Sequence, residues 1–230
     1  MISHEDAVAL ARERFGPGRD GNPVDVGLHE FDLGYVAWPV EPSAPAQADP
    51  EAVPHSPGGA RIVIDKQTGR VSVFPSLPVS VVAASYADTR AAEVRFPADV
   101  REVLAGAGWF PGRDIGAAVD RWLAGAAEPL HALAAPDVAR RALAEFGRLV
   151  LPQYGPTGVL GGGFWTRFYP TDRTLVTEHL SYFGERLGSP VFPLGSSQDE
   201  GAELVVDAAG RVFLLHWVGD LSSPTASTRR

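Results

Sequence analysis

The 230-residue sequence contains no cysteine. This absence excludes disulfide bridges, thiolate metal ligands and a cysteine nucleophile, and it suits a reducing compartment. The chain also lacks an apolar run long enough to cross a bilayer. Near its start stand His4, Glu5 and Asp6, where a secretory signal would need positive charge followed by an apolar stretch. We therefore expect a cytoplasmic protein without a membrane partner.

Basic side chains are in the minority. The 20 Lys and Arg residues stand against 28 Asp and Glu residues, which gives a formal net charge of −8. This balance disfavours direct contact with a nucleic-acid backbone, and it suits either a basic protein partner or simple solubility. With 45% hydrophobic and 21% charged residues, the composition is typical of a folded globular protein, and the length allows one large or two small domains.

No pattern typical of catalysis or metal binding occurs in the chain. The six histidines are never spaced i, i+2 or i, i+4, so no two share a strand face or a helix face locally. The Gly-x-Ser-x-Gly elbow of serine hydrolases is absent. The glycine run 161–163 leads into a strand pattern without a following Gly-Lys-Ser/Thr, which argues against a phosphate loop. We expect no enzyme, no cofactor and no metal site.

Two β-hairpins are predicted in the N-terminal part of the chain. Residues 24–31 and 35–38 alternate apolar and polar side chains, as strands with one buried face do. Residues 61–65 and 70–74 flank Lys66-Gln67-Thr68-Gly69, a turn sequence, and predict a second hairpin.

One helix is predicted before these hairpins and another after them. Ser3 and the acidic residues behind it open the first helix, which ends at Gly16. The second begins at Val79 and is expected to end around Asp88. The order helix, four strands, helix predicts an α+β unit over residues 1–92, with both helices on one face of an antiparallel sheet.

This N-terminal unit resembles the YrhB-like immunity family. The resemblance is carried by the run from Ile62 to Gly69 and by Phe74-Pro75-Ser76-Leu77-Pro78, which stands directly before a helix.

A tight corner between two helices is predicted at residues 107–115. The flanking helices are expected over 97–107 and 115–126, where apolar residues recur at helical spacing. Gly108 can end the first helix and Asp114 can cap the second.

The corner itself carries four residues that we interpret as a structural motif. Trp109 is expected to pack beneath the crossing helices, and Pro111-Gly112 forms the turn. Arg113 is placed to bond freed helix-end carbonyls or a carboxylate. A well-packed corner and a ligand site both remain open as interpretations.

The remaining residues alternate between helical and strand patterns. Together with the corner they predict a second α+β unit over 93–230, again an antiparallel sheet with helices packed on it, which ends in a short polar tail. The expected helices cover 136–149 and 172–187, and the expected strands cover 164–169, 191–195, 203–207 and 211–215.

This second unit resembles the third group of the SUKH immunity superfamily. The corner, Glu145-Phe146-Gly147, the approach Phe192 to Gly195 and the hairpin Asp207 to Phe213 carry the resemblance. The sequence departs from the family at Arg148, where the family usually has glycine, and at the C-terminus, where the family usually closes with a helix. The resemblance implies a bacterial immunity protein that binds and neutralises a polymorphic toxin domain, for example a nuclease or a deaminase.

Two regions are candidates for contact with such a toxin. The acidic loop Gln198-Asp199-Glu200 can enter the basic cleft of a toxin that acts on nucleic acid, and Trp165 and Tyr169 near a sheet edge can anchor the complex. A solvated loop and core aromatic residues are the alternatives. A different class of function also stays open, namely a small-molecule-binding or enzymatic domain with a pocket between the two units.

Overall fold

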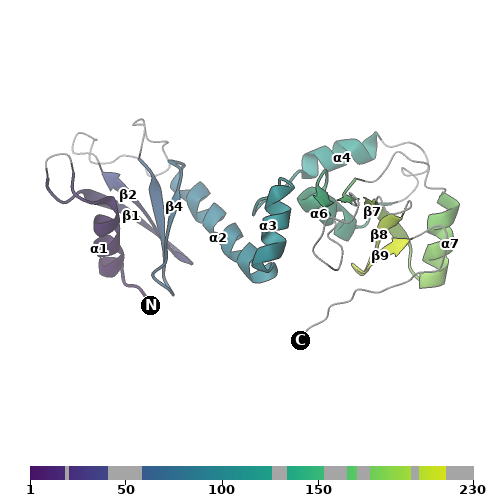
Figure 1. Ribbon diagram of the computed structural model, residues 1–230, viewed down its shortest axis with the longest axis horizontal. Helices are drawn as coiled ribbons and strands as arrows, with labels where there is room; N and C mark the ends of the chain where they lie inside the picture. The colour runs from purple at the N-terminus through teal and green to yellow at the C-terminus, as the bar shows by residue number, and fades with distance from the viewer. Residues whose placement is uncertain are drawn as a thin grey trace. The chain divides into compact units, whose positions relative to one another are not determined.

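The computed structural model divides into two compact units, Met1–Arg95 and Phe96–Arg230 (Figure 1). Each unit is an α+β arrangement built on one antiparallel sheet, which confirms the predicted fold class. The structure describes residues 1–18, 21–40, 59–125, 134–152, 165–169, 177–197 and 202–215.

The N-terminal unit holds a four-stranded sheet in the order β1-β2-β3-β4. Both predicted hairpins are present, with Asp25 of β1 paired to Val40 and Arg61 of β3 paired to Phe74. The elements are α1 (His4–Phe15), β1 (Asp25–Phe31), β2 (Gly34–Val40), β3 (Arg61–Asp65), β4 (Val71–Phe74) and α2 (Val79–Arg95).

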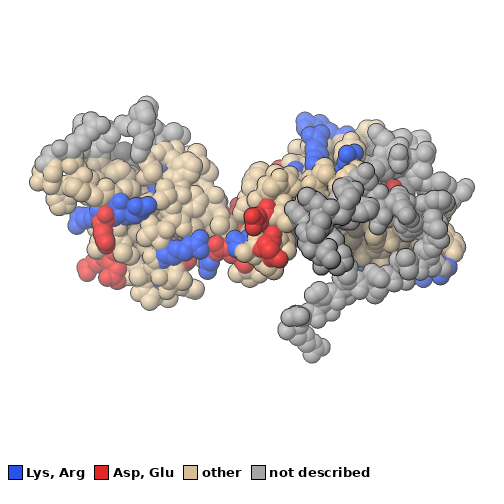
Figure 2. Space-filling view, in the orientation of Figure 1, with Lys and Arg blue, Asp and Glu red and all other residues tan. Residues whose placement is uncertain are grey.

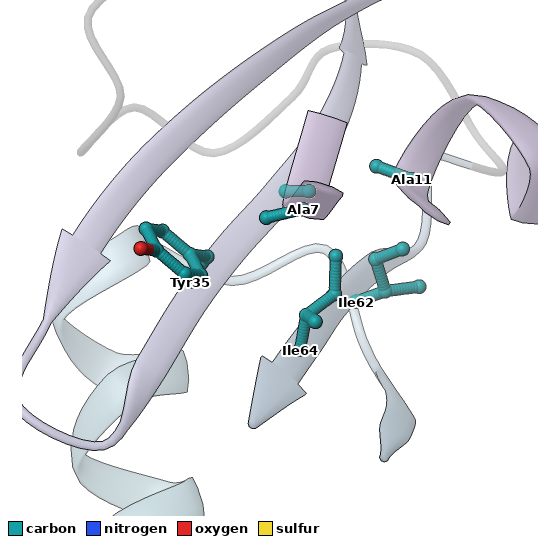
Figure 3. Close-up of a cluster of buried hydrophobic side chains, with 6 residues drawn as sticks. Ala7, Ala11, Tyr35, Ile62 and Ile64 are labelled. Carbon is teal, nitrogen blue, oxygen red and sulfur yellow. The ribbon is translucent and has the colours of Figure 1, made fainter. Parts of the chain in front are cut away.

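Helices α1 and α2 cover opposite faces of this sheet (Figure 1), so the prediction that they share one face is wrong. Helix α1 packs against Ile62 and Ile64 (Figure 3), whereas α2 packs against Val36 and Val63. Successive residues of a strand point to opposite faces, so the central positions of a strand covered on both sides must all be apolar. The unbroken run Ile62-Val63-Ile64 meets this requirement, and every residue of β3 is buried.

Helix α2 continues to Arg95, so the prediction that it ends around Asp88 is also wrong. Residues 79–96 contain neither glycine nor proline, and Pro97 is the first residue that disfavours helical continuation. The added length places Arg90 and Glu93 beside the hairpin of β3 and β4, where Arg70 pairs with Glu93 at 3.2 Å.

A buried carboxylate ties this hairpin to α2. Asp65 is 4% exposed, and its Oδ1 accepts hydrogen bonds from the amides of Gln67 (2.9 Å) and Thr68 (2.8 Å). Its Oδ2 accepts a hydrogen bond from the Tyr86 hydroxyl at 2.7 Å. Burial opposes ionisation, but the hydrogen bonds outweigh it and hold the pKa of Asp65 below its ordinary value of 3.8. Burial and the bond to Asp65 raise the pKa of Tyr86 to about 12.

The C-terminal unit holds a five-stranded sheet in the order β5-β6-β7-β8-β9. Helices α4 and α6 cover one face through Val119 and Leu143, and α7 covers the other through Leu180. The elements are α3 (Ala98–Gly106), α4 (Gly116–Ala124), α6 (Asp137–Phe146), β5 (Val150–Pro152), β6 (Trp165–Arg167), α7 (Thr177–Leu187), β7 (Val191–Ser197), β8 (Glu203–Asp207) and β9 (Val212–Leu215).

The helix predicted over 136–149 is shorter than expected. It ends at Phe146, and the chain turns at Gly147 and Arg148 into β5, a strand that the sequence pattern did not predict. A side chain at Gly147 would place its Cβ 2.3 Å from the Leu143 carbonyl oxygen, so only glycine fits where the helix ends.

The β8–β9 hairpin repeats the buried carboxylate of the N-terminal unit. Asp207 is fully buried, and it accepts hydrogen bonds from the amide (2.9 Å) and Nε (2.6 Å) of Arg211. Burial again opposes ionisation, and the bonds from Arg211 again lower the pKa of the carboxyl below 3.8. Each turn contains a left-handed glycine, Gly69 with φ 71° and Gly210 with φ 81°. One ionised aspartate thus closes a hairpin in each unit.

We predict that acidification destabilises both units through these two carboxyl groups. A carboxyl whose pKa is lower in the folded chain stabilises the fold above its unfolded pKa, and the contribution is lost as the pH falls through the folded pKa. Thermal unfolding followed by circular dichroism should show a Tm that falls between about pH 5 and pH 2.

The variants Asp65→Asn and Asp207→Asn should have a lower Tm at pH 7 and a flatter Tm profile over that range. Asp88→Asn, at an exposed position of α2, is the matched control and should follow the wild type. A wild-type profile in both buried-site variants would contradict the prediction.

Candidate functional site

The corner between α3 and α4 is built on a buried indole. Trp109 is 6% exposed and meets the Phe96 ring edge to face at 5.6 Å. Phe96 in turn contacts Phe146 at the end of α6, and Phe146 contacts Phe168 just beyond β6. The four rings connect the corner to the end of strand β6. Trp109 therefore belongs to the packing of the unit and is not available to a ligand.

Pro111, Gly112 and Arg113 complete the corner. Gly112 has φ 75°, and its left-handed backbone is the reason for glycine at this position. The Arg113 guanidinium donates to the carbonyl oxygens of Glu145 and, at 2.7 Å, Gly147. Arg113 thus holds the C-terminal end of α6 against the start of α4. Burial lowers the pKa of Arg113, and the nearby positive charge of Arg148 lowers it further.

A small pocket lies beside this corner. It has a volume of about 60 Å³ and is bounded by α4, the turn after α6 and the residue Tyr169. The rings of Trp122 and Tyr169 stack at a centroid distance of 4.5 Å and an angle of 34°. The lining residues are Ile115, Ala118, Val119, Trp122, Gly147, Arg148 and Tyr169.

The backbone at the pocket rim is unusual. Arg148 has φ 67°, a left-handed conformation that a side chain with a Cβ disfavours. Its amide donates to the Phe168 carbonyl at 2.7 Å, and the Phe168 amide donates to the Leu149 carbonyl at 3.0 Å. These two hydrogen bonds form with the backbone of residue 148 in the left-handed conformation. Glycine at position 148 would adopt that conformation without strain.

Models of immunity protein families match both units of the chain. The SUKH-3 immunity protein model matches residues 96–225. The chain belongs to the SUKH-3 immunity protein family. The immunity protein 35-like domain model matches residues 5–93, which lie within the N-terminal unit. Searches among curated proteins and among solved structures found no match.

The predicted aromatic contacts of this SUKH-3 protein are both half-buried. The Trp165 ring lies under the guanidinium of Arg167, with 4.6 Å between the guanidinium carbon and the ring centroid. Tyr169 is one wall of the pocket through its contact with Trp122. The acidic loop Gln198-Asp199-Glu200 lies outside the described residues, and so does the predicted polar tail.

Charges of both signs are interspersed on the N-terminal unit (Figure 2). Lys66 pairs with Glu30 at 2.8 Å and Arg70 with Glu93 at 3.2 Å. Within the described ranges, no group of three or more His, Asp or Glu side chains could hold a metal ion. In the same part of the chain, no helix is both long and apolar enough to cross a membrane.

The sequence did not predict the pocket of this SUKH-3 protein. Trp122 lies within the helix predicted over 115–126, and Tyr169 was predicted as an anchor near a sheet edge, with a core aromatic residue as the alternative. The one signal in the sequence was Arg148, at a position where the resemblance implies glycine. A non-glycine residue at such a position indicates either strain or a role for its side chain.

We predict that Arg113 stabilises the C-terminal unit through its two carbonyl contacts. Arg113→Ala should lower the free energy of unfolding by about 2 kcal/mol, because hydrogen bonds from a charged donor to partly buried acceptors are lost. Urea denaturation followed by tryptophan fluorescence measures the change. Arg121→Ala, at an exposed position of α4, is the control and should change the value by less than about 0.5 kcal/mol. Equal stability of the two variants would refute this role of Arg113.

Proposed function

We propose that this protein binds a cognate polymorphic toxin domain, a nuclease or a deaminase, in the bacterial cytoplasm and blocks its activity without catalysing a reaction. The observation that supports the proposal best is that two immunity protein domains stand in tandem in one chain. The finer YrhB-like assignment of the N-terminal domain belongs to the same proposal. Inhibition by binding needs an exposed surface of the right shape and charge, and no reactive group.

We place part of the contact surface on β6 and the residues that follow it. Tryptophan, tyrosine and arginine dominate the binding energy of protein interfaces, because they combine a large apolar area with polar ends. Trp165, Arg167 and Tyr169 supply all three types within five positions, and the Arg167 guanidinium lies over the Trp165 ring. The acidic loop 198–200 is the proposed contact to a basic substrate cleft of the toxin.

Co-expression tests the proposed function directly. A bacterial host that produces the toxin encoded beside this gene should stop growing, and co-expression of the full chain should restore growth. The purified toxin domain and the full chain should also elute together in size-exclusion chromatography. Failure of the intact chain both to restore growth and to elute with the toxin would remove the proposal. A rise in Tm with a nucleotide or a metal ion instead would favour a small-molecule function.

We predict that Trp165 is an energetic anchor of the complex. Trp165→Ala should weaken the Kd for the toxin domain at least about 30-fold, as the loss of a central aromatic contact does. The matched control is Tyr182→Ala, at an aromatic residue of α7 that is 50% exposed. Isothermal titration calorimetry gives both affinities, and the Tm of each variant reports on its folding. A toxin affinity of Trp165→Ala equal to that of the control would exclude the anchor.

A further inference from the structure

Arg148 combines backbone strain with a side chain that has no partner inside the described part of the chain. Of the described non-glycine residues, it alone has a positive φ. The hydrogen bond from its amide to the Phe168 carbonyl involves only the backbone, so glycine at position 148 would form it equally well. Within the described residues, no hydrogen bond or ion pair holds its exposed guanidinium. Among the described residues, the strain at Arg148 is therefore offset by no hydrogen bond or ion pair of its own side chain, which points to a role at the surface.

The surroundings of Arg148 determine what the pocket can accept. A volume of about 60 Å³ has room for one small group and is far below that of a cofactor site. The stacked rings of Trp122 and Tyr169 form an apolar wall, and Arg148 places a positive charge at the rim. The neighbouring guanidinium of Arg113 donates to two carbonyl oxygens, and among the described residues it forms no ion pair with a carboxylate.

Among the described residues, no carboxylate forms an ion pair with Arg148. The carboxylate of Asp120 on α4 is paired instead with Arg140 at 2.8 Å. An anionic group entering the pocket would therefore meet an arginine that is not paired with a described carboxylate. Guanidinium binds carboxylate in a planar, two-point geometry, which makes carboxylate the matching ligand.

We propose that the pocket of Trp122, Arg148 and Tyr169 receives an aspartate or glutamate side chain of the bound toxin domain. The carboxylate pairs with Arg148, and the methylene groups pack against the two rings. This inference rests on the proposed function and adds a specificity-determining residue to it. The net charge of −8 repels acidic surfaces at long range, so the pocket acts at short range and selects the register of the complex.

The decisive variant is Arg148→Gly, because strain and function predict opposite effects. Glycine adopts the left-handed backbone freely, so the Tm should rise by about 2–4 °C. The Kd for the toxin domain should nevertheless weaken at least about tenfold, since the charged pair is lost. Arg148→Lys should fall between the wild type and Arg148→Gly in affinity. Arg141→Ala, at an exposed arginine of α6, is the control and should leave the affinity unchanged.

A toxin affinity of Arg148→Gly equal to that of the wild type would overturn the pocket proposal and leave the proposed function intact. If the toxin domain does not bind the wild-type chain, the proposed function is contradicted. A second measurement then tests whether the pocket binds a carboxylate at all. Titration with glutarate should shift the Trp122 indole N–H resonance in ¹H–¹⁵N spectra, and titration with glutaramide should not. The shift should disappear in Arg148→Gly. Absence of the shift in the wild type would overturn the proposal.

Discussion

Both units depend on central strands that are apolar on both faces. In the N-terminal sheet, Ile62 and Ile64 face α1 while Val63 faces α2, and in the C-terminal sheet Val205 and Val206 divide between α7 and the α4–α6 layer in the same way. A strand covered on two sides leaves no room for polar groups except at its ends. Asp65 and Asp207 stand at those ends, where their carboxylates bond the turn that follows.

The residues that stabilise the two units differ from those that we propose for recognition of a partner. The buried aspartates, the Trp109 corner and the Arg113 contacts all lie where they hold elements together. The residues that we propose for contact with a partner lie on the strand β6, on the turn after α6 and on the rim of the small pocket. Arg148 is the point where the two demands conflict, because its backbone suits glycine while its side chain offers a charge at the surface. Strained residues of this kind persist where the surrounding structure fixes their conformation, and they are common at functional sites.

Local patterns predicted most of the elements. The turn sequences at 66–69 and 208–210 are short and contain a glycine, so both hairpins follow from local conformational preference. The corner at 107–115 follows equally from its glycines and its proline. Strand β5 was missed because it spans only Val150–Pro152, too short for any alternation to be visible. Helix α2 was predicted too short, although residues 79–96 contain neither glycine nor proline.

The amino-acid sequence by itself determined the α+β class, the hairpins, the corner and the resemblance to immunity proteins, because these depend on residues close together in the chain. The tertiary structure decided which sheet face each helix covers and where the side chains from distant segments meet. Trp122, Arg148 and Tyr169 come from α4, the turn after α6 and the segment after β6, and only folding brings them to one pocket. Spacing along a chain records periodicity, whereas a binding site is set by the packing of elements in space.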